Sequence, residues 1–346
     1  MTAADSQGEA RRGLWAWAIY DWANSAFYTV VMTFVFAPYF AEAVIGADVP
    51  AGEPAAIGTP QWGYTLAVGG ALAAVGGPVL GAIADRSGRR KPWIAALTGL
   101  CVLATVALWF VRPEPFYMWL AMPLVVIASV SADYAVVFYN AMLPTLAPAH
   151  RLGRWSGWAW ALGYAGGLSC LVGALLLKDY GSWVGLSSEA LANVRAAFVL
   201  AGLWFGLFAL PLLLLTPDSP STGKPLAQVT REGLQQLMRT IRHVRQYRHI
   251  VRFLVARMIY VDGLGTVFAF GGIYASQTFG VEALHFGIAV NVTAGLGAAG
   301  FAWVDDWIGG KRTVAIAIVA LMLCGAVLVL AQSVLLFWIF GLALGL

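Results

Sequence analysis

Long apolar stretches recur along the whole chain, and they restrict its fold more than any other feature. About twenty apolar residues cross a hydrocarbon core of about 30 Å as an α-helix. The sequence therefore predicts an all-α polytopic membrane protein with nine to ten spanning helices. The expected spans are residues 14–45, 62–84, 93–111, 115–143, 155–177, 196–215, 253–276, 284–304 and 313–331, with a shorter tenth from Val334 to Leu346.

The composition excludes a soluble globular protein. Hydrophobic residues make up 60% of the 346 residues and charged residues only 11%, whereas roughly a quarter of a soluble protein is charged. The three cysteines lie in apolar stretches without metal-ligand spacing, so neither a disulfide framework nor a zinc site is expected. The first apolar stretch is too long for a signal peptide, and we expect it to be the first span.

The basic residues predict the orientation of the chain. Of the 21 Lys and Arg residues, only Arg112, Lys178 and Arg195 fall in segments opposite the N-terminus, and Arg257 falls inside a span. All the others lie on the N-terminal side. Because cytoplasmic loops of membrane proteins are enriched in Lys and Arg, the N-terminus is expected in the cytoplasm of a bacterium, with the protein in the inner membrane.

A polar segment divides the chain into three parts. The Thr216–Pro220 sequence TPDSP breaks the helical pattern. The predicted parts are a six-helix bundle at residues 1–215, a cytoplasmic linker at 216–252 and a partial second bundle at 253–346. Within the linker, apolar residues recur at helical spacing between arginines: Leu234, Leu237, Met238, Ile241, Val244 and Val251. This pattern indicates an amphipathic helix on anionic lipid, with nucleic-acid binding as the weaker alternative.

Two pieces of sequence occur once in each half. The first span contains Tyr20-Asp21, and the seventh contains Tyr260-Val261-Asp262. The loops after the second and eighth spans both read Asp, then Gly three residues later, then cations. Parallel six-span halves are a transporter architecture, and charged loops between helices can hold them in one arrangement and release them in another. The predicted switch residues are Gly81, Asp85, Arg86, Gly88, Arg89, Arg90 and Lys91 in the first loop, and Asp306, Gly309 and Lys311 in the second. Alternatively, the cations only follow the positive-inside rule.

The segment from Gly81 to Lys91 resembles the short signature loop of the major facilitator superfamily. The segments 17–27, 137–144, 257–263 and 270–275 resemble one branch of it, the autophagy-related vacuolar amino-acid effluxers and their bacterial permease relatives. The resemblance covers nearly the whole chain. It implies a fold of twelve membrane helices. It also implies efflux of amino acids in the fungal members and leaves the substrates of the bacterial members open. Because this chain shows nine to ten, we expect it to be a truncated product or a fragment.

Charged residues inside spans are costly and usually face a cavity or a partner. Asp21, Asp133 and Asp262 share a predicted depth of roughly 10 to 15 Å from the cytoplasmic face, and Arg257 is the only cation within reach. Polar residues follow the acids along the same helical faces. The predicted substrate-binding and proton-binding residues are Asp21, Asn24, Ser25, Tyr28, Asp133, Asn140, Arg257, Tyr260 and Asp262. The alternative is a static buried ion pair and interhelical hydrogen bonds that only fix helix packing.

Small residues four apart occur on several spans, including Gly153 with Gly157, Gly163 with Gly167 and Gly295 with Ala299. This spacing lets helix backbones approach closely. We expect these helices either to slide against each other during transport or to pack closely at rest.

Sequences typical of ATP hydrolysis, zinc proteases and serine hydrolases are missing from the chain. The predicted function is secondary active transport of a small solute by alternating access, coupled to protons and without a cofactor, by a monomer. Three alternatives remain: a drug or metabolite exporter on the same fold, a membrane scaffold that does not transport, and an intramembrane enzyme, for which no nucleophile and base are visible.

Overall fold

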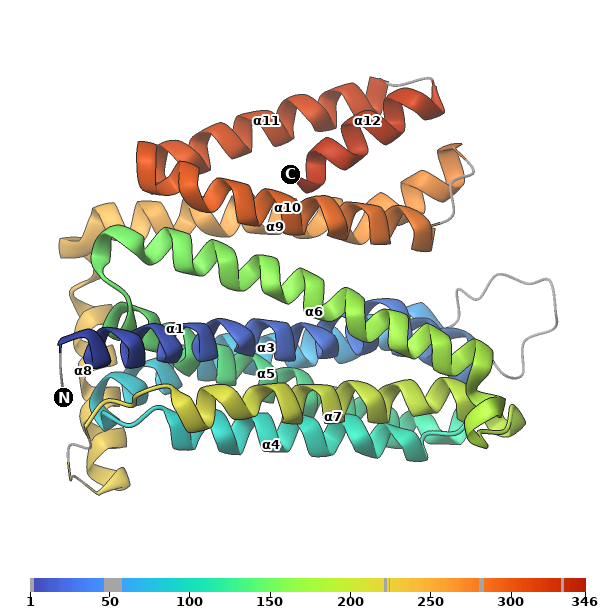
Figure 1. Cartoon of the computed structure of the whole chain (residues 1–346), viewed down its shortest axis with the longest axis horizontal. Helices are drawn as coiled ribbons and strands as arrows, with labels where there is room; N and C mark the ends of the chain where they lie inside the picture. Colours follow the sequence, from blue (N-terminus) through green and yellow to red (C-terminus); the bar gives the residue numbers. More distant parts are fainter. Residues whose placement is uncertain (1–2, 47–57, 221–222, 224, 280–282, 331–332) are drawn as a thin grey trace.

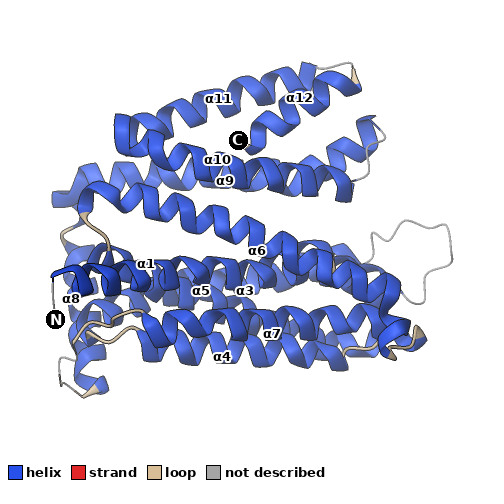
Figure 2. Cartoon of the chain, viewed as in Figure 1, coloured by secondary structure: helices blue, strands red, loops and turns tan. Residues whose placement is uncertain are grey.

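The computed structural model describes residues 3–46, 58–220, 223, 225–279, 283–330 and 333–346. Within these ranges every regular element is helical (Figure 2). The prediction of an all-α protein is confirmed.

The first helical group, α1 to α7, contains five further long helices after the N-terminal one. α1 (Ala3–Ala26) continues as the π-helix Phe27–Phe34, the short α2 (Phe36–Pro38) and the π-helix Tyr39–Ile45. The others are α3 (Gly58–Ser87), α4 (Lys91–Ala107), α5 (Met118–Leu146), α6 (Leu152–Tyr180) and α7 (Ala192–Leu215).

The chain then forms α8 (Leu226–Arg242) and the second helical group. This group comprises α9 (Arg248–Phe279), α10 (Ala283–Ile308), α11 (Gly310–Leu330) and α12 (Val334–Gly345). The long helices of both groups run roughly side by side (Figure 1).

Eight helices in the described ranges are long and apolar enough to cross a membrane. They correspond to the first six predicted spans and to those at 284–304 and 313–331. α9, where the seventh span is predicted, is helical throughout but is not one of the eight, and α12 is a shorter apolar helix.

α1 lies in the middle of the first helical group and packs on α6, α7 and α5. Its side chains Trp17 and Tyr20, and Phe27 at the start of the π-helix that continues it, are almost completely buried. The glycines of α6 make the close approach possible, because a Cβ atom at Gly166 would overlap the backbone of Trp22. The predicted pair Gly163 and Gly167 also faces α1, because Cβ atoms there would lie 2.7 Å from Ser25 Oγ and 3.2 Å from the Ser25 carbonyl oxygen.

α6 also packs on α10 and so joins the two helical groups (Figure 1). A Cβ atom at Gly157 would lie 2.7 Å from the Cβ of Ala302. The rings of Trp158 and Trp303 meet edge to face, with centroids 5.7 Å apart. Small residues on α6 therefore serve two interfaces, one with α1 and one with the second helical group.

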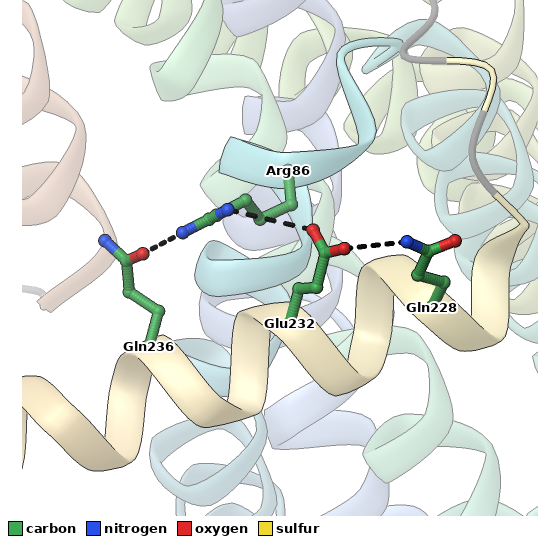
Figure 3. Close-up of polar contacts among 4 residues, drawn as sticks. All are labelled: Arg86, Gln228, Glu232 and Gln236. Carbon is green, nitrogen blue, oxygen red and sulfur yellow. Dashed lines mark hydrogen bonds and ion pairs between the residues drawn. The ribbon is translucent and has the colours of Figure 1, made fainter.

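α8 crosses one end of the first helical group (Figure 1). We call this end, where α1 begins and the α3–α4 loop lies, the basic end. Val229 is buried, and a Cβ atom at Gly233 would lie 2.9 Å from the carbonyl oxygen of Ala82 in α3. Arg86 at the end of α3 forms an ion pair of 3.8 Å with Glu232 and donates to Gln236 (Figure 3). One face of α8 therefore packs on protein.

The amphipathic pattern predicted for the linker extends past the end of this helix. α8 ends at Arg242, a short 3-10 turn covers Val244–Tyr247, and α9 starts at Arg248. Val251 therefore lies in α9, on a different helix from Leu234 and Met238.

Candidate functional site

Two tyrosines and two aspartates link α1 to α5. The Tyr139 hydroxyl of α5 donates to Asp21 Oδ2 of α1 at 3.0 Å. The hydroxyl of Tyr28, in the π-helix Phe27–Phe34 that continues α1, donates to Asp133 Oδ1 of α5 at 2.7 Å. Each helix therefore supplies one acid and one phenol to the other. We call these four residues the tyrosine–aspartate network.

Both acids are half-buried inside predicted spans. Among the described residues, neither Asp21 nor Asp133 forms a salt bridge. Their partners in the described part of the chain are neutral hydroxyl and amide donors, so no cation there balances the two carboxylates. Such groups inside a membrane typically mark a solute or proton pathway.

The aromatic residues around Tyr139 hold its ring in place. Trp17 stacks on the ring with centroids 4.4 Å apart and an interplanar angle of 6°, and its indole N–H donates to the Tyr139 carbonyl at 3.0 Å. Tyr20 also stacks on Tyr139, with centroids 5.0 Å apart, and its hydroxyl pairs with Thr98 Oγ1 at 2.7 Å. The hydroxyl that reaches Asp21 is therefore positioned by a rigid aromatic stack.

Asn24 and Ser25 extend the polar line from Asp21 along α1. The amide of Asn24 donates to Asp21 Oδ1 at 3.4 Å, and the Ser25 hydroxyl donates to Asn24 Oδ1 at 3.5 Å. Gly163 of α6 lies against this line, because a Cβ atom there would come within 2.7 Å of Ser25 Oγ. The structure thus places five predicted residues in two hydrogen-bonded sets. One contains Asp21, Asn24 and Ser25, and the other contains Tyr28 and Asp133.

The other predicted residues lie apart from this network. Asn140 is exposed on α5. On α9, Arg257 and Asp262 are exposed and Tyr260 is half-buried. In the part of the chain that the structure describes, no hydrogen bond or ion pair joins Arg257 to an acid.

The first of the two repeated loops, Gly81 to Lys91, is hydrogen-bonded to the segment that follows α7. Asp218 accepts hydrogen bonds from the backbone N–H groups of Arg90 at 2.9 Å and Lys91 at 3.2 Å, where α4 begins. The Lys91 ammonium donates to the Thr216 carbonyl at 2.7 Å. A carboxylate at a helix N-terminus satisfies backbone donors that have no partner within the helix.

The remaining residues of this loop have different positions. Arg86 contacts α8, Arg89 is exposed, and Gly81 lies in α3. The side chain of Asp85 lies outside the described residues.

The two repeated loops share an unusual backbone conformation. Gly88 has φ +76° and Gly309 has φ +84°, in the left-handed region that favours glycine. In the second loop Asp306 forms an ion pair of 2.7 Å with Arg154 of α6, and Lys311 is exposed. The repeated glycine therefore has a conformational reason in both halves.

The profile of the family described as "Vacuole effluxer Atg22 like" matches residues 62–154 and 151–341. The chain belongs to this family. The predicted resemblance to that branch of the major facilitator superfamily is confirmed.

A curated relative of this Atg22-like chain is YxiO of Bacillus subtilis (strain 168), described as an uncharacterized MFS-type transporter. The two are 30% identical over 265 residues. The match covers 76% of this chain and 60% of YxiO, so the chain spans about 60% of the length of that relative.

Solved transporters share the fold. The proton:xylose symporter XylE from E. coli superposes with a TM-score of 0.67 at 16% identity, covering 98% of this chain and 79% of XylE. The human organic anion transporter MFSD10 (TETRAN) superposes with a TM-score of 0.64 at 15% identity, covering 97% and 82%. At these identities the likeness shows the major facilitator fold alone.

Two site residues of this Atg22-like chain are absent from the sequence-based prediction. Tyr139 completes the tyrosine–aspartate network, and Arg154 pairs with Asp306 between the helical groups. A tyrosine inside a span needs a partner for its hydroxyl, which is a signal for Tyr139. Arg154 is one of many cations predicted on the N-terminal side, and its sequence position does not distinguish it.

Proposed function

We propose that this chain moves a small solute, an amino acid, across the membrane by alternating access, coupled to protons. The observation that carries this proposal is the tyrosine–aspartate network, which places two acids inside the first helical group beside hydroxyl donors. Among the residues that the structure describes, neither acid is paired with a cation. Carboxylates in such positions serve as proton relays in pumps and transporters. The family and the fold are those of transporters.

An amino acid suits the charges on the two helical groups. Its ammonium group would be attracted to the carboxylates of Asp21 or Asp133 on the first group. Its carboxylate would be attracted to Arg257 on the second group, where a guanidinium can bind it with two hydrogen bonds. A solute that binds both groups at once can favour the arrangement in which they close around it.

Alternating access needs a contact that can break, and the α6–α10 interface contains one. Arg154 and Asp306 join the two helical groups at the basic end. Separation of this pair would let α6 and α10 move apart there. We therefore propose that the basic end, which we place in the cytoplasm, opens when the pair is lost.

Uptake into reconstituted vesicles tests the proposal. The purified chain would be supplied with each common amino acid, with xylose and organic anions as comparison solutes, with and without an imposed pH gradient. We expect uptake of at least one amino acid and a larger rate with the gradient. Uptake of another solute alone would refute the substrate class, and no effect of the gradient would refute proton coupling.

Asparagine substitutions test the role of each acid. We expect Asp21→Asn and Asp133→Asn to lower uptake and to flatten its dependence on pH, because neither amide can take up the proton. The matched control is Asp179→Asn, since Asp179 is exposed at the end of α6 outside the network. Uptake with unchanged size and pH dependence would remove that acid from the mechanism.

A further inference from the structure

A groove between α1 and α7 lies at the basic end of the first helical group. It has a volume of about 420 Å³ and is lined by Arg11, Arg12, Trp15 and Ile19 of α1 and by Pro211 and Leu215 of α7. The candidate spans formed by these two helices begin at Arg11 and end at Leu215. The groove therefore lies where the hydrocarbon core meets the lipid headgroups.

The walls of the groove are held rigidly. Thr216, which follows α7, donates to the carbonyl of Gly13 in α1 at 3.1 Å. The ring of Trp15 stacks on Trp158 with centroids 5.8 Å apart and meets Trp155 edge to face at 5.2 Å. The two helices that line the groove therefore hold a fixed position, since α1 contacts both α6 and the segment that follows α7.

Polar and apolar groups are separated along the groove. Arg11 and Arg12 are exposed, and within the described ranges neither forms an ion pair. Leu215 is 63% exposed and Trp15 38% exposed, so apolar surface continues from the two arginines toward the interior of the bilayer. Tryptophan is typical of the membrane–water interface.

This separation matches an amphiphile with an anionic head and a hydrocarbon tail. A free phosphate would satisfy the arginines but leave the apolar wall uncovered, and a zwitterionic lipid would leave a net positive charge. Basic pockets between membrane helices bind anionic headgroups. We propose that the α1–α7 groove binds one anionic phospholipid, with its phosphate on Arg11 and Arg12 and an acyl chain along Ile19 and Leu215.

Photo-crosslinking tests this site without a transport measurement, so its outcome does not depend on the proposed function. The chain would be reconstituted with phosphatidylglycerol that carries a diazirine on one acyl chain, and separately with the matching phosphatidylcholine. Crosslinked peptides would be mapped by mass spectrometry. We expect phosphatidylglycerol to label the α1 and α7 peptides more strongly than phosphatidylcholine does.

Charge variants identify the headgroup contact. Each basic residue near an anionic surface contributes roughly fivefold in affinity. Arg11→Gln with Arg12→Gln should therefore raise the phosphatidylglycerol concentration that gives half-maximal labelling about 25-fold. The matched control is Arg231→Gln with Arg239→Gln on α8, which removes equal charge from the exposed face of that helix. This control should leave labelling of α1 and α7 unchanged.

A filled groove tests the acyl-chain contact with both arginines present. Ile19→Trp adds volume to the wall and should abolish labelling at α1 and α7, with the thermal unfolding temperature confirming that the variant is folded. Equal labelling by both lipids would overturn the proposal. Unchanged labelling of the Arg11/Arg12 variant, or an equal loss in the α8 control, would overturn it as well.

Discussion

Arg154 of α6 and Asp306 of α10 form an ion pair of 2.7 Å that joins the two helical groups at the basic end. Their side chains are 30% and 13% exposed, so water screens the pair only in part. Gly157 and Ala302 pack closely on one side of it, and Trp158 meets Trp303 nearby. Because Asp306 belongs to the second repeated loop, this loop binds the first helical group through Arg154.

Removal of one partner of this pair should open the basic end. We expect Arg154→Gln or Asp306→Asn to destabilise the contact between the basic ends of α6 and α10 by about 1–2 kcal/mol, since the remaining charge is left half-buried. Spin labels on the basic ends of α6 and α10 would show a longer distance by electron paramagnetic resonance. The exchanged variant, Arg154→Asp with Asp306→Arg, should restore the short distance. If both single variants keep the short distance, the ion pair does not hold the two helical groups together.

Loss of the Tyr139 hydroxyl should impair transport more than folding. Tyr139→Phe keeps the stack on Trp17 but removes the donor to Asp21. Hydrogen bonds to charged groups contribute roughly 1.5–3 kcal/mol, so uptake should fall about tenfold or more if this bond is needed during transport. Tyr28→Phe should act similarly at Asp133. Tyr180→Phe, at an exposed position, is the control for loss of a hydroxyl.

A methyl group at Gly166 should destabilise the first helical group. Gly166→Ala would overlap the backbone of Trp22, and forced overlap in a packed interior costs typically about 1–3 kcal/mol. Gly70→Ala on α3 is the matched control, because nothing lies within 4 Å of its Cβ position. The control should be stabilised by about 1 kcal/mol through helix propensity. Unfolding at increasing concentrations of a denaturing detergent would compare the stabilities of the two variants. Equal stabilities would show that α6 and α1 can move apart without loss of stability.

The cap on α4 should stabilise the first signature loop. Asp218→Ala removes the acceptor for the N–H groups of Arg90 and Lys91 and should cost about 1–2 kcal/mol, as for other helix caps. Asp218→Asn keeps one acceptor oxygen and should cost less. Amide hydrogen exchange at the start of α4 would report the change. Similar protection in the wild type and the Ala variant would show that the cap is dispensable.

Several properties follow from the sequence because they depend on residues near each other in the chain. The lengths of the apolar stretches predict the membrane helices from 14–45 to 196–215, and the repeated Asp and Gly predict the paired turns at Gly88 and Gly309. The acids of the network are also visible, because a charged residue in an apolar span stands out locally. These features require no knowledge of which helix lies beside which.

Only the tertiary structure decides which of these residues meet. Tyr139 and Asp21 are 118 positions apart, and Arg90 and Asp218 are 128 apart. α8 carries a pattern typical of a lipid-bound helix, yet the contacts of Val229 and Gly233 place one of its faces on α3. Helical periodicity determines which side of a helix is polar. The partner of that side depends on how several helices pack together, and such long-range pairings leave no local pattern in a single sequence.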